Sequence, residues 1–298
     1  MKTRRHLRPM PLSRWLVSAA IGMLPLAAQD FSKIQIERLA QGLTYTEGPA
    51  WSKDGYLIFS DTPTGKLWKW VPGHVSEVYR EDAHGPSGNA FDGEGRLYTC
   101  ETHARRVTRT DKKGVVEVIA ERWEGKRLNA PNDVTVSRTG HVYFTDPAFG
   151  SQADSRELEF YGVYHIPPKG PMKLVAKPAG RPNGIALSPN GRLLYVVNSD
   201  ERNVRVYDVD RNGDTSNERV LISGIEGVPG GMAVDDKGNL YVTANGIEIY
   251  TPGGQHLHTI PIKGRVSNCT FGEADGKSLI VTSGAFVYRL RMDGKGAE

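Results

Sequence analysis

A carboxylate and two amides occupy matching positions in this sequence of 298 residues. Glu47 lies in the segment TEGPAW, Asn132 in APNDV and Asn183 in RPNGI, and each stands eight residues before a turn glycine. Carboxylate and amide oxygens are the ligands that a hard cation such as Ca²⁺ takes, with water completing six to eight ligands. These residues therefore form a candidate metal site, provided that the fold brings them together.

The elements that would position them repeat along the chain. One phrase recurs six times: a β-rich run, a turn with glycine and a second β-rich run, and a further pair of β-rich runs follows it. The turn glycines are Gly55, Gly95, Gly140, Gly191, Gly238 and Gly276. They are 38 to 51 residues apart, and four strands per unit at this period are typical of propeller blades. The sequence predicts an all-β fold, a six-bladed β-propeller with four-stranded antiparallel blades around a central channel.

A β-sandwich is the alternative fold, but a sandwich gives no reason for one phrase to recur six times. The run 34–43 precedes the first phrase and the run 286–292 follows the last. Pairing of these two runs would close the ring and remove its free edges. We therefore expect a single closed propeller over residues 31–298.

In such a fold the first strand of each blade lines the channel, so equivalent residues form a ring. Counting eight residues back from each turn glycine gives Glu47, Ser87, Asn132, Asn183, Gly230 and Asn268. An extra residue in FGEAD is the alternative for the last position and would displace it. An alternative is that Asn and Gly simply suit the turn into a strand. That alternative explains Asn183 before a glycine but not Glu47, so we interpret the ring as a divalent-cation site. All-oxygen ligands favour Ca²⁺ or Mg²⁺ over Zn²⁺.

Other polar residues end the second strands and should surround the mouth of the channel, at the face where the first strands begin: Asp61, Glu101, His103, Asp146 and Asn198. His103 is a candidate general base at neutral pH, and Glu101 or Asp146 could complete the metal site. The alternative for the aspartates is a capping role in turns. Arg127 and Asn129 precede Asn132 and are candidates for substrate binding, or else solvated loop residues.

Several motifs together resemble the gluconolactonase/regucalcin family of calcium-dependent propeller hydrolases, in particular its bacterial gluconolactonase branch. They are TEGPAW (46–51), CETHARRVTRTDKKG (100–114), KRLNAPNDV (126–134), VYFTDPAFG (142–150), RPNGIALSPNGRLLYV (181–196) and GMAVDDKGNLYV (231–242). The resemblance covers residues 37–290. It implies one divalent cation, commonly Ca²⁺ or Zn²⁺, held by Glu47, Asn132 and Asn183, which polarises a lactone carbonyl.

The sequence departs from the family at the fourth ligand. Where the family has an aspartate in a PDG motif, this chain has Gly230 between Pro229 and Gly231. Asp235 and Asp236 lie at the hairpin turn, about 15 Å away at roughly 3.3 Å per residue, and cannot replace it. The resemblance thus predicts a site that lacks one carboxylate and a candidate base, which an aspartate at position 230 would restore.

We therefore expect a metal-dependent hydrolase of a sugar lactone, in which water attacks the polarised carbonyl. The expected catalytic residues are His103 and Asp146, and the expected substrate-binding residues are Arg127, Asn129, Glu101 and Asn268. Two alternatives stay open: a propeller that has lost catalysis and binds a sugar acid or another small ligand, and a metal-dependent esterase or phosphotriesterase.

The charge of the chain is concentrated at its N-terminus. The formal net charge is +4, but residues 1–28 carry five basic residues and no acidic one, which leaves −1 for the rest. A near-neutral body gives no electrostatic footprint for nucleic acid. The uncharged run 15–29 is typical of a signal peptide. We expect cleavage near 27–30, export to a bacterial periplasm or beyond, no membrane attachment afterwards and a monomer without a disulfide between Cys100 and Cys269.

Overall fold

The computed structural model describes residues 30–297 of the chain. The predicted signal peptide, residues 1–28, lies outside these residues. Within them the structure contains six four-stranded sheets and a two-stranded ribbon, with short 3-10 turns η1 (Phe31–Lys33) and η2 (Gly150–Ser155). No helix in this described part is long and apolar enough to cross a membrane.

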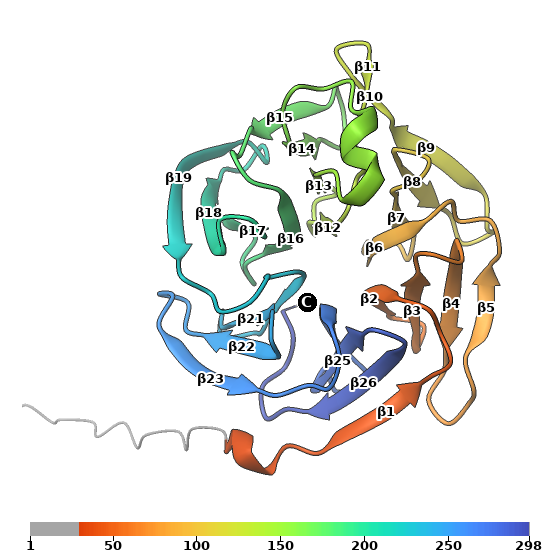
Figure 1. Ribbon diagram of the computed structural model, residues 1–298, viewed down its shortest axis with the longest axis vertical. Coiled ribbons are helices and arrows are strands. Elements are labelled where there is room, and N and C mark those ends of the chain that lie inside the picture. The colour runs from red at the N-terminus through yellow and green to blue at the C-terminus, as the bar shows by residue number, and fades with distance from the viewer. Residues whose placement is uncertain (1–29, 298) are drawn as a thin grey trace, which may run out of the picture.

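The six sheets are arranged around a central channel as the blades of a propeller (Figure 1). Blades 1 to 3 are β2–β5 (Thr46–Ser52, Tyr56–Asp61, Lys66–Trp70, Glu77–Arg80), β6–β9 (Pro86–Phe91, Leu97–Glu101, Arg106–Thr110, Val116–Ala120) and β12–β15 (Val134–Val136, Val142–Asp146, Gly162–Ile166, Lys173–Ala176). Blades 4 and 5 are β16–β19 (Pro182–Leu187, Leu193–Asn198, Asn203–Val209, Thr215–Ile222) and β20–β23 (Met232–Val234, Leu240–Thr243, Ile247–Tyr250, His256–Ile260). Blade 6 combines β24 (Val266–Gly272), β25 (Ser278–Ser283) and β26 (Phe286–Arg291) with β1 (Ile36–Ala40). The ribbon β10–β11 (Arg122–Trp123, Lys126–Arg127) precedes blade 3.

The predicted hairpins are confirmed, and their glycines explain why the chain reverses there. All six turn glycines have positive φ, from +67° at Gly191 to +86° at Gly55. Glycine adopts this region without the steric cost of a Cβ, so each glycine lets its hairpin turn tightly. The antiparallel pairing of the first two strands follows in every blade, as in β2 with β3 and β24 with β25.

The ring is closed by the two ends of the chain. β1 pairs antiparallel with β26, with Ile36 opposite Leu290 and Arg38 opposite Tyr288. β1 is therefore the outermost strand of blade 6, beside the last strand in sequence (Figure 1). This confirms the predicted pairing of 34–43 with 286–292.

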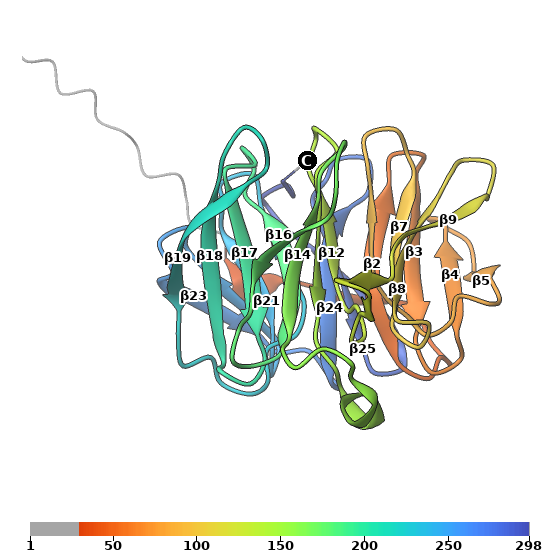
Figure 2. The same cartoon turned by 90° about the horizontal axis from the view of Figure 1, so that it is seen from above.

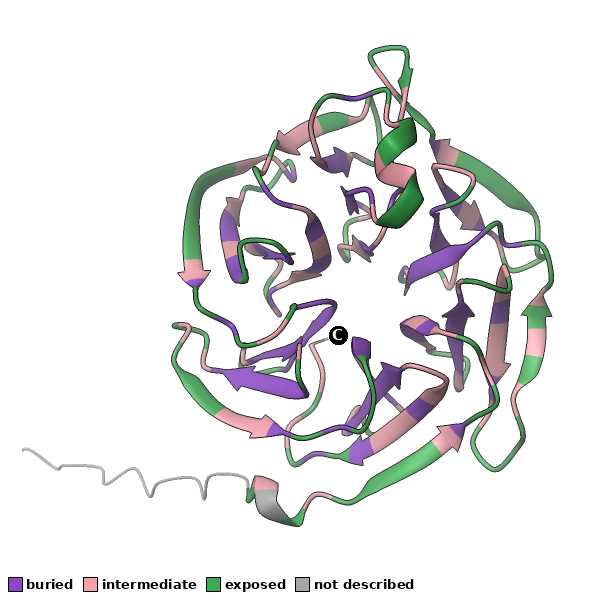
Figure 3. Ribbon diagram, viewed as in Figure 1, coloured by how far each residue is buried: buried purple, intermediate pink, exposed green. Residues whose placement is uncertain are grey.

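The hydrophobic core is divided among the blade interfaces. Each of six buried clusters joins side chains from two adjacent blades, for example Leu57 and Phe59 of blade 1 with Ile280 and Val287 of blade 6. The inner strands are mostly buried, whereas outer strands such as β9 and β19 are largely exposed (Figure 3). The interlocked interfaces hold the inner strands in place and so give the channel a fixed wall.

The propeller has two distinct faces. We call the face at which the six innermost strands begin the start face, and the face that carries the six hairpin turns the turn face. The C-terminal segment returns to the turn face, where Ala297 N donates to Val234 O. η2 lies at the opposite face (Figure 2).

Blade 3 contains a pair of buried histidines that contact each other. His141 Nδ1 lies 2.8 Å from His165 Nε2, and the ring of Tyr143 stacks on His165 with centroids 4.7 Å apart. Burial, reinforced by the neighbouring His141, lowers the pKa of His165 to about 4. The pair is therefore neutral near pH 7.

This pair should make the folded protein sensitive to acid. The unfolded chain takes up a proton on histidine near pH 6.5, whereas folded His165 does so only near pH 4. The contribution of neutral His165 to the free energy of unfolding is thus fully present above pH 6.5 and is lost as the pH falls toward 4. The loss is about 2 kcal/mol between pH 7 and pH 5. Denaturant unfolding of His165→Gln should show a smaller loss over this range than the parent. A loss of equal size would contradict the assignment, and His74→Gln, at an exposed histidine, is the control.

Candidate functional site

The ring residues are fixed by hydrogen bonds between neighbouring inner strands. Asn132 O accepts from Gly88 N of blade 2 at 2.7 Å, and Asn132 N donates to Thr145 O at 2.9 Å. Asn183 O accepts from Thr145 Oγ1 of blade 3 at 2.7 Å. Each inner strand is thus tied to the next, and Glu47, Asn132 and Asn183 lie at one level of the channel near the start face.

The sixth member of this ring differs from the prediction. The carbonyl oxygen of a ring residue accepts a hydrogen bond from the preceding blade, where the donor is the amide of the residue just after that blade's ring position. Gly88 N donates to Asn132 O, Gly184 N to Gly230 O and Gly231 N to Ser267 O. Ser267, and not Asn268, is therefore the blade 6 equivalent of Glu47. The turn after β24 contains one residue more than the others, which displaced the count by one.

The hydrogen bonds of the Asn183 amide leave its oxygen available as a ligand. Asn183 Nδ2 donates to Ser199 Oγ at 3.0 Å, and Ser199 Oγ donates to Pro229 O at 2.7 Å. This directional chain leaves Asn183 Oδ1 as the unused acceptor. With the Glu47 carboxylate, the donor set suits a hard divalent cation. Among residues 30–297, no three or more His, Cys, Asp or Glu side chains group as a metal site, so such a site depends on the amides.

A second carboxylate, which the sequence analysis did not select, lies one residue deeper. Asp133 is buried, and its carboxylate accepts from Val134 N at 3.0 Å and from Ile185 N at 3.2 Å. Its Oδ1 lies 2.2 Å from where a Cβ on Gly88 would stand. The sequence does contain a signal for Asp133. The residue at this level is a glycine in four blades (Gly48, Gly88, Gly184 and Gly231), and only Asp133 and Asn268 carry side chains there.

Asn268 connects the two carboxylates. Its Oδ1 accepts from Cys269 N at 2.8 Å, and its side-chain amide acts to lower the pKa of both Glu47 and Asp133. Asn268 is 5% exposed, so these contacts give it a positioning role and do not support the predicted contact with substrate. It holds the carboxylates beneath the ring.

The surroundings of both carboxyl groups favour their neutral forms. Burial raises the pKa of Glu47 to about 8, and the nearby Asp133 adds to this shift. Burial also raises the pKa of Asp133 to about 7. Two acidic groups in one desolvated space favour either a shared proton or a bound cation.

Gly230 does not leave an open position in the ring. A Cβ at Gly230 would lie 2.5 Å from Ser267 O and 2.9 Å from Thr243 Oγ1. Because the nearest atom belongs to the backbone, an aspartate at position 230 would require β20 and β24 to separate. The expectation that Gly230→Asp simply completes the ring therefore does not fit this structure, and Asp133 is the nearby second carboxylate.

Three predicted site residues are engaged in structural bonds. Asp146 is fully buried and accepts from Asn129 N and Ala130 N, each at 2.8 Å. Asn129 Nδ2 donates to Asp146 O and Phe160 O. Glu101 is 1% exposed and pairs with Arg80 and Arg106, each at 2.7 Å. These contacts favour scaffolding roles: Asp146 and Asn129 shape the loop that presents Asn132, and Glu101 anchors the end of β7.

His103 and Arg127 lie closer to the mouth of the channel. His103 is exposed, and its imidazole covers Gly85, within 2.4 Å of where a Cβ would be. Gly85 stands two residues before Ser87, so the imidazole lies at the rim on the start face. Arg127 donates from Nη2 to Ala104 O at 3.0 Å, which ties its guanidinium to the loop that carries His103.

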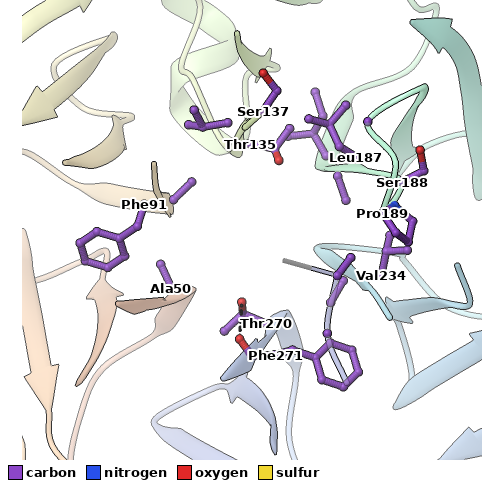
Figure 4. A pocket seen from close by; sticks show the side chains of 18 of the residues that line it. Ala50, Phe91, Thr135, Ser137, Leu187, Ser188, Pro189, Val234, Thr270 and Phe271 are labelled. Carbon is purple, nitrogen blue, oxygen red and sulfur yellow. Dashed lines mark hydrogen bonds between the residues drawn. The ribbon is translucent and has the colours of Figure 1, made fainter. Parts of the chain in front are cut away.

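A cavity opens on the other face. It has a volume of about 1150 Å³, and its wall includes Phe91, Leu187 and Phe271 from the inner strands (Figure 4). Asp133 and Asn268 line it, but Glu47, Asn132 and Asn183 do not. This turn-face cavity thus reaches the level of Asp133 and Asn268 but is not lined by the ring residues.

The protein is thus a closed six-bladed propeller whose channel carries a carboxylate and amides at one level. Residues 45–285 match the SMP-30/Gluconolactonase/LRE-like region. The chain belongs to this family. The predicted family resemblance is thereby confirmed.

Individual relatives agree with this membership. The chain is 34% identical to a gluconolactonase of Zymomonas mobilis, over 86% of this chain and 81% of the relative. The structure of a gluconolactonase from Xanthomonas campestris matches with a TM-score of 0.81 and 33% identity, covering 87% of this chain and 89% of that one. A calcium-binding regucalcin from Agrobacterium tumefaciens has a TM-score of 0.77 at 20% identity, over 88% and 95% of the two chains, which shows likeness of fold alone.

Proposed function

We propose that this protein hydrolyses a sugar lactone at the start-face end of the channel. The observation that carries the proposal is the ring of Glu47, Asn132 and Asn183 in a chain that is 34% identical to a gluconolactonase. The closed propeller holds Glu47 in β2, Asn183 in β16 and Asn132 just before β12, and a site that must orient a substrate requires such fixed positions.

The same residues are proposed to hold one divalent cation, with Ca²⁺ favoured by the oxygen donors. Bound there, the cation would act as a Lewis acid that polarises the lactone carbonyl. Glu47 supplies negative charge to this position, and Asn183 supplies Oδ1 because Ser199 occupies its Nδ2. Asp133 adds a second buried carboxylate from beneath the ring.

His103 is proposed as the proton-transfer group, with Arg127 beside it. The imidazole lies at the rim, where it can meet water at the exposed end of the channel. A positioned acid–base group of this kind typically contributes roughly 10²- to 10⁴-fold in rate. Asp146 and Glu101 are not assigned this role because their carboxylates accept structural bonds.

Acid release from a panel of sugar lactones, followed in a pH-stat, tests the proposal. The purified protein should hydrolyse at least one lactone well above the spontaneous rate, and His103→Ala should lower kcat by roughly 10²-fold or more. Binding of a sugar acid without acceleration of any lactone would instead favour the binding-module alternative.

We also propose export, on the basis of the basic N-terminus and the uncharged run that follows it. The exported protein should then begin between Ala27 and Phe31. Intact mass spectrometry of the protein recovered from a periplasmic extract measures this directly. Recovery only from the cytoplasm with residues 15–28 intact would contradict export.

A further inference from the structure

A second ring of residues lies two positions outward from the first. Its members stand two residues before the ring residues, in the loops that lead into the innermost strands at the start face. This rim ring consists of Tyr45, Gly85, Ala130, Arg181, Val228 and Arg265. It contains two arginines, one on blade 4 and one on blade 6, at the mouth through which a substrate would enter.

The two arginines differ in their partners. Arg181 forms an ion pair with Asp200, with Nη2 2.5 Å from Oδ1, and Nε lies 3.0 Å from both carboxylate oxygens. Its guanidinium also lies 4.7 Å from the ring centroid of Phe149. The charge of Arg181 is therefore already neutralised within the protein.

Arg265 has no such neutralising partner. Its guanidinium lies 5.5 Å from the ring centroid of Tyr45, on the neighbouring blade 1. Arg265 is exposed, and within residues 30–297 it forms no ion pair. Its neighbour in the rim ring, Val228, is 58% exposed, so the space beside the guanidinium is open to solvent.

The charge of Arg265 reaches the proposed cation site. The aromatic ring that its guanidinium contacts belongs to Tyr45, which stands two residues before Glu47. In the neighbouring blade 5, Gly230 provides no carboxylate that would neutralise this charge. The mouth therefore carries, on blade 6, an exposed guanidinium that forms no ion pair within residues 30–297.

We infer that Arg265 binds an anionic group of the substrate, and that the preferred lactone carries a carboxylate or a phosphate besides its lactone ring. This inference rests on the proposed function. A guanidinium offers a planar fork that matches carboxylate and phosphate oxygens in a bidentate manner. The contact with Tyr45 holds the guanidinium near the mouth before the substrate arrives, which reduces the entropy lost on binding.

The test compares kcat/KM for gluconolactone, which is neutral, with glucarolactone and 6-phosphogluconolactone, which carry a carboxylate and a phosphate. Arg265→Gln should lower kcat/KM for the preferred anionic lactone by roughly 10- to 100-fold, as for loss of a charged hydrogen bond, and that for gluconolactone by less than about threefold. The two anionic lactones distinguish the carboxylate from the phosphate. Lys263→Gln, which removes one exposed positive charge two residues away, should leave the ratio of anionic to neutral lactone unchanged.

An equal loss on charged and neutral lactones, or no loss on either, would overturn the inference while leaving lactone hydrolysis intact. If the parent protein hydrolyses none of the three, the proposed function fails, and calorimetry then decides the role of Arg265 by itself. Tighter binding of glucarate than of gluconate, abolished in Arg265→Gln, would still support an anion-binding residue. Equal binding of both acids by the two proteins would reject it.

Discussion

Replacing Glu47 with glutamine is expected to lower Ca²⁺ affinity by at least about 100-fold, beyond the roughly 10- to 100-fold loss typical of groups outside the ligand shell. The amide keeps the shape of the side chain and can still accept from Gly48 N. The propeller should therefore remain folded. Isothermal titration calorimetry with Ca²⁺ on the parent and the variant measures the change.

The same substitution should stabilise the protein when no cation is bound. Burial raises the pKa of Glu47 to about 8, so its charge destabilises the fold progressively as the pH rises from about 4.5 to 8. Removing that charge should raise the unfolding free energy at pH 8 in chelator. Asp92→Asn is the control, because Asp92 bonds Arg96 at a hairpin turn and its loss should leave Ca²⁺ affinity unchanged. Unchanged affinity in Glu47→Gln would remove this residue from the site.

Asp133→Asn is expected to weaken Ca²⁺ binding by roughly 10- to 100-fold, the range for a group that supports metal ligands from behind. The remaining oxygen can keep one of the bonds from Val134 N and Ile185 N. If both carboxylates act on one ion, the effects of Glu47→Gln and Asp133→Asn should not be additive. A double-mutant cycle by calorimetry measures the coupling. Normal affinity in Asp133→Asn would limit Asp133 to its backbone bonds.

The fold was predictable because its determinants are local. Each blade repeats an apolar run, a glycine that needs positive φ and a second apolar run, so the period appears in the sequence itself. The closure of the ring by β1 also followed, because two unpaired runs remained at opposite ends of the chain. The spacing from turn glycine to ring residue then placed Glu47, Asn132 and Asn183 at equivalent positions.

The finer features depend on contacts between blades and were therefore out of reach of a count along the chain. The turn after β24 contains one additional residue, so counting back from its glycine selects Asn268 although Ser267 occupies the ring position. The engagement of Glu101 with two arginines and of Asp146 with a loop backbone depends on side chains brought together from separate strands. Gly230 looked like an open position, yet the carbonyl of Ser267 occupies the space.

The most direct test of the account is the recovery of lactone hydrolysis as Ca²⁺ is returned to chelator-treated protein. The rate should be near the spontaneous value without metal, rise with each addition and stop rising at one equivalent of Ca²⁺ per chain. Under the same conditions Glu47→Gln should recover little. Full hydrolysis by the stripped protein, or no recovery after Ca²⁺ or another divalent cation is restored, would contradict a cation held by Glu47, Asn132 and Asn183 as the centre of catalysis.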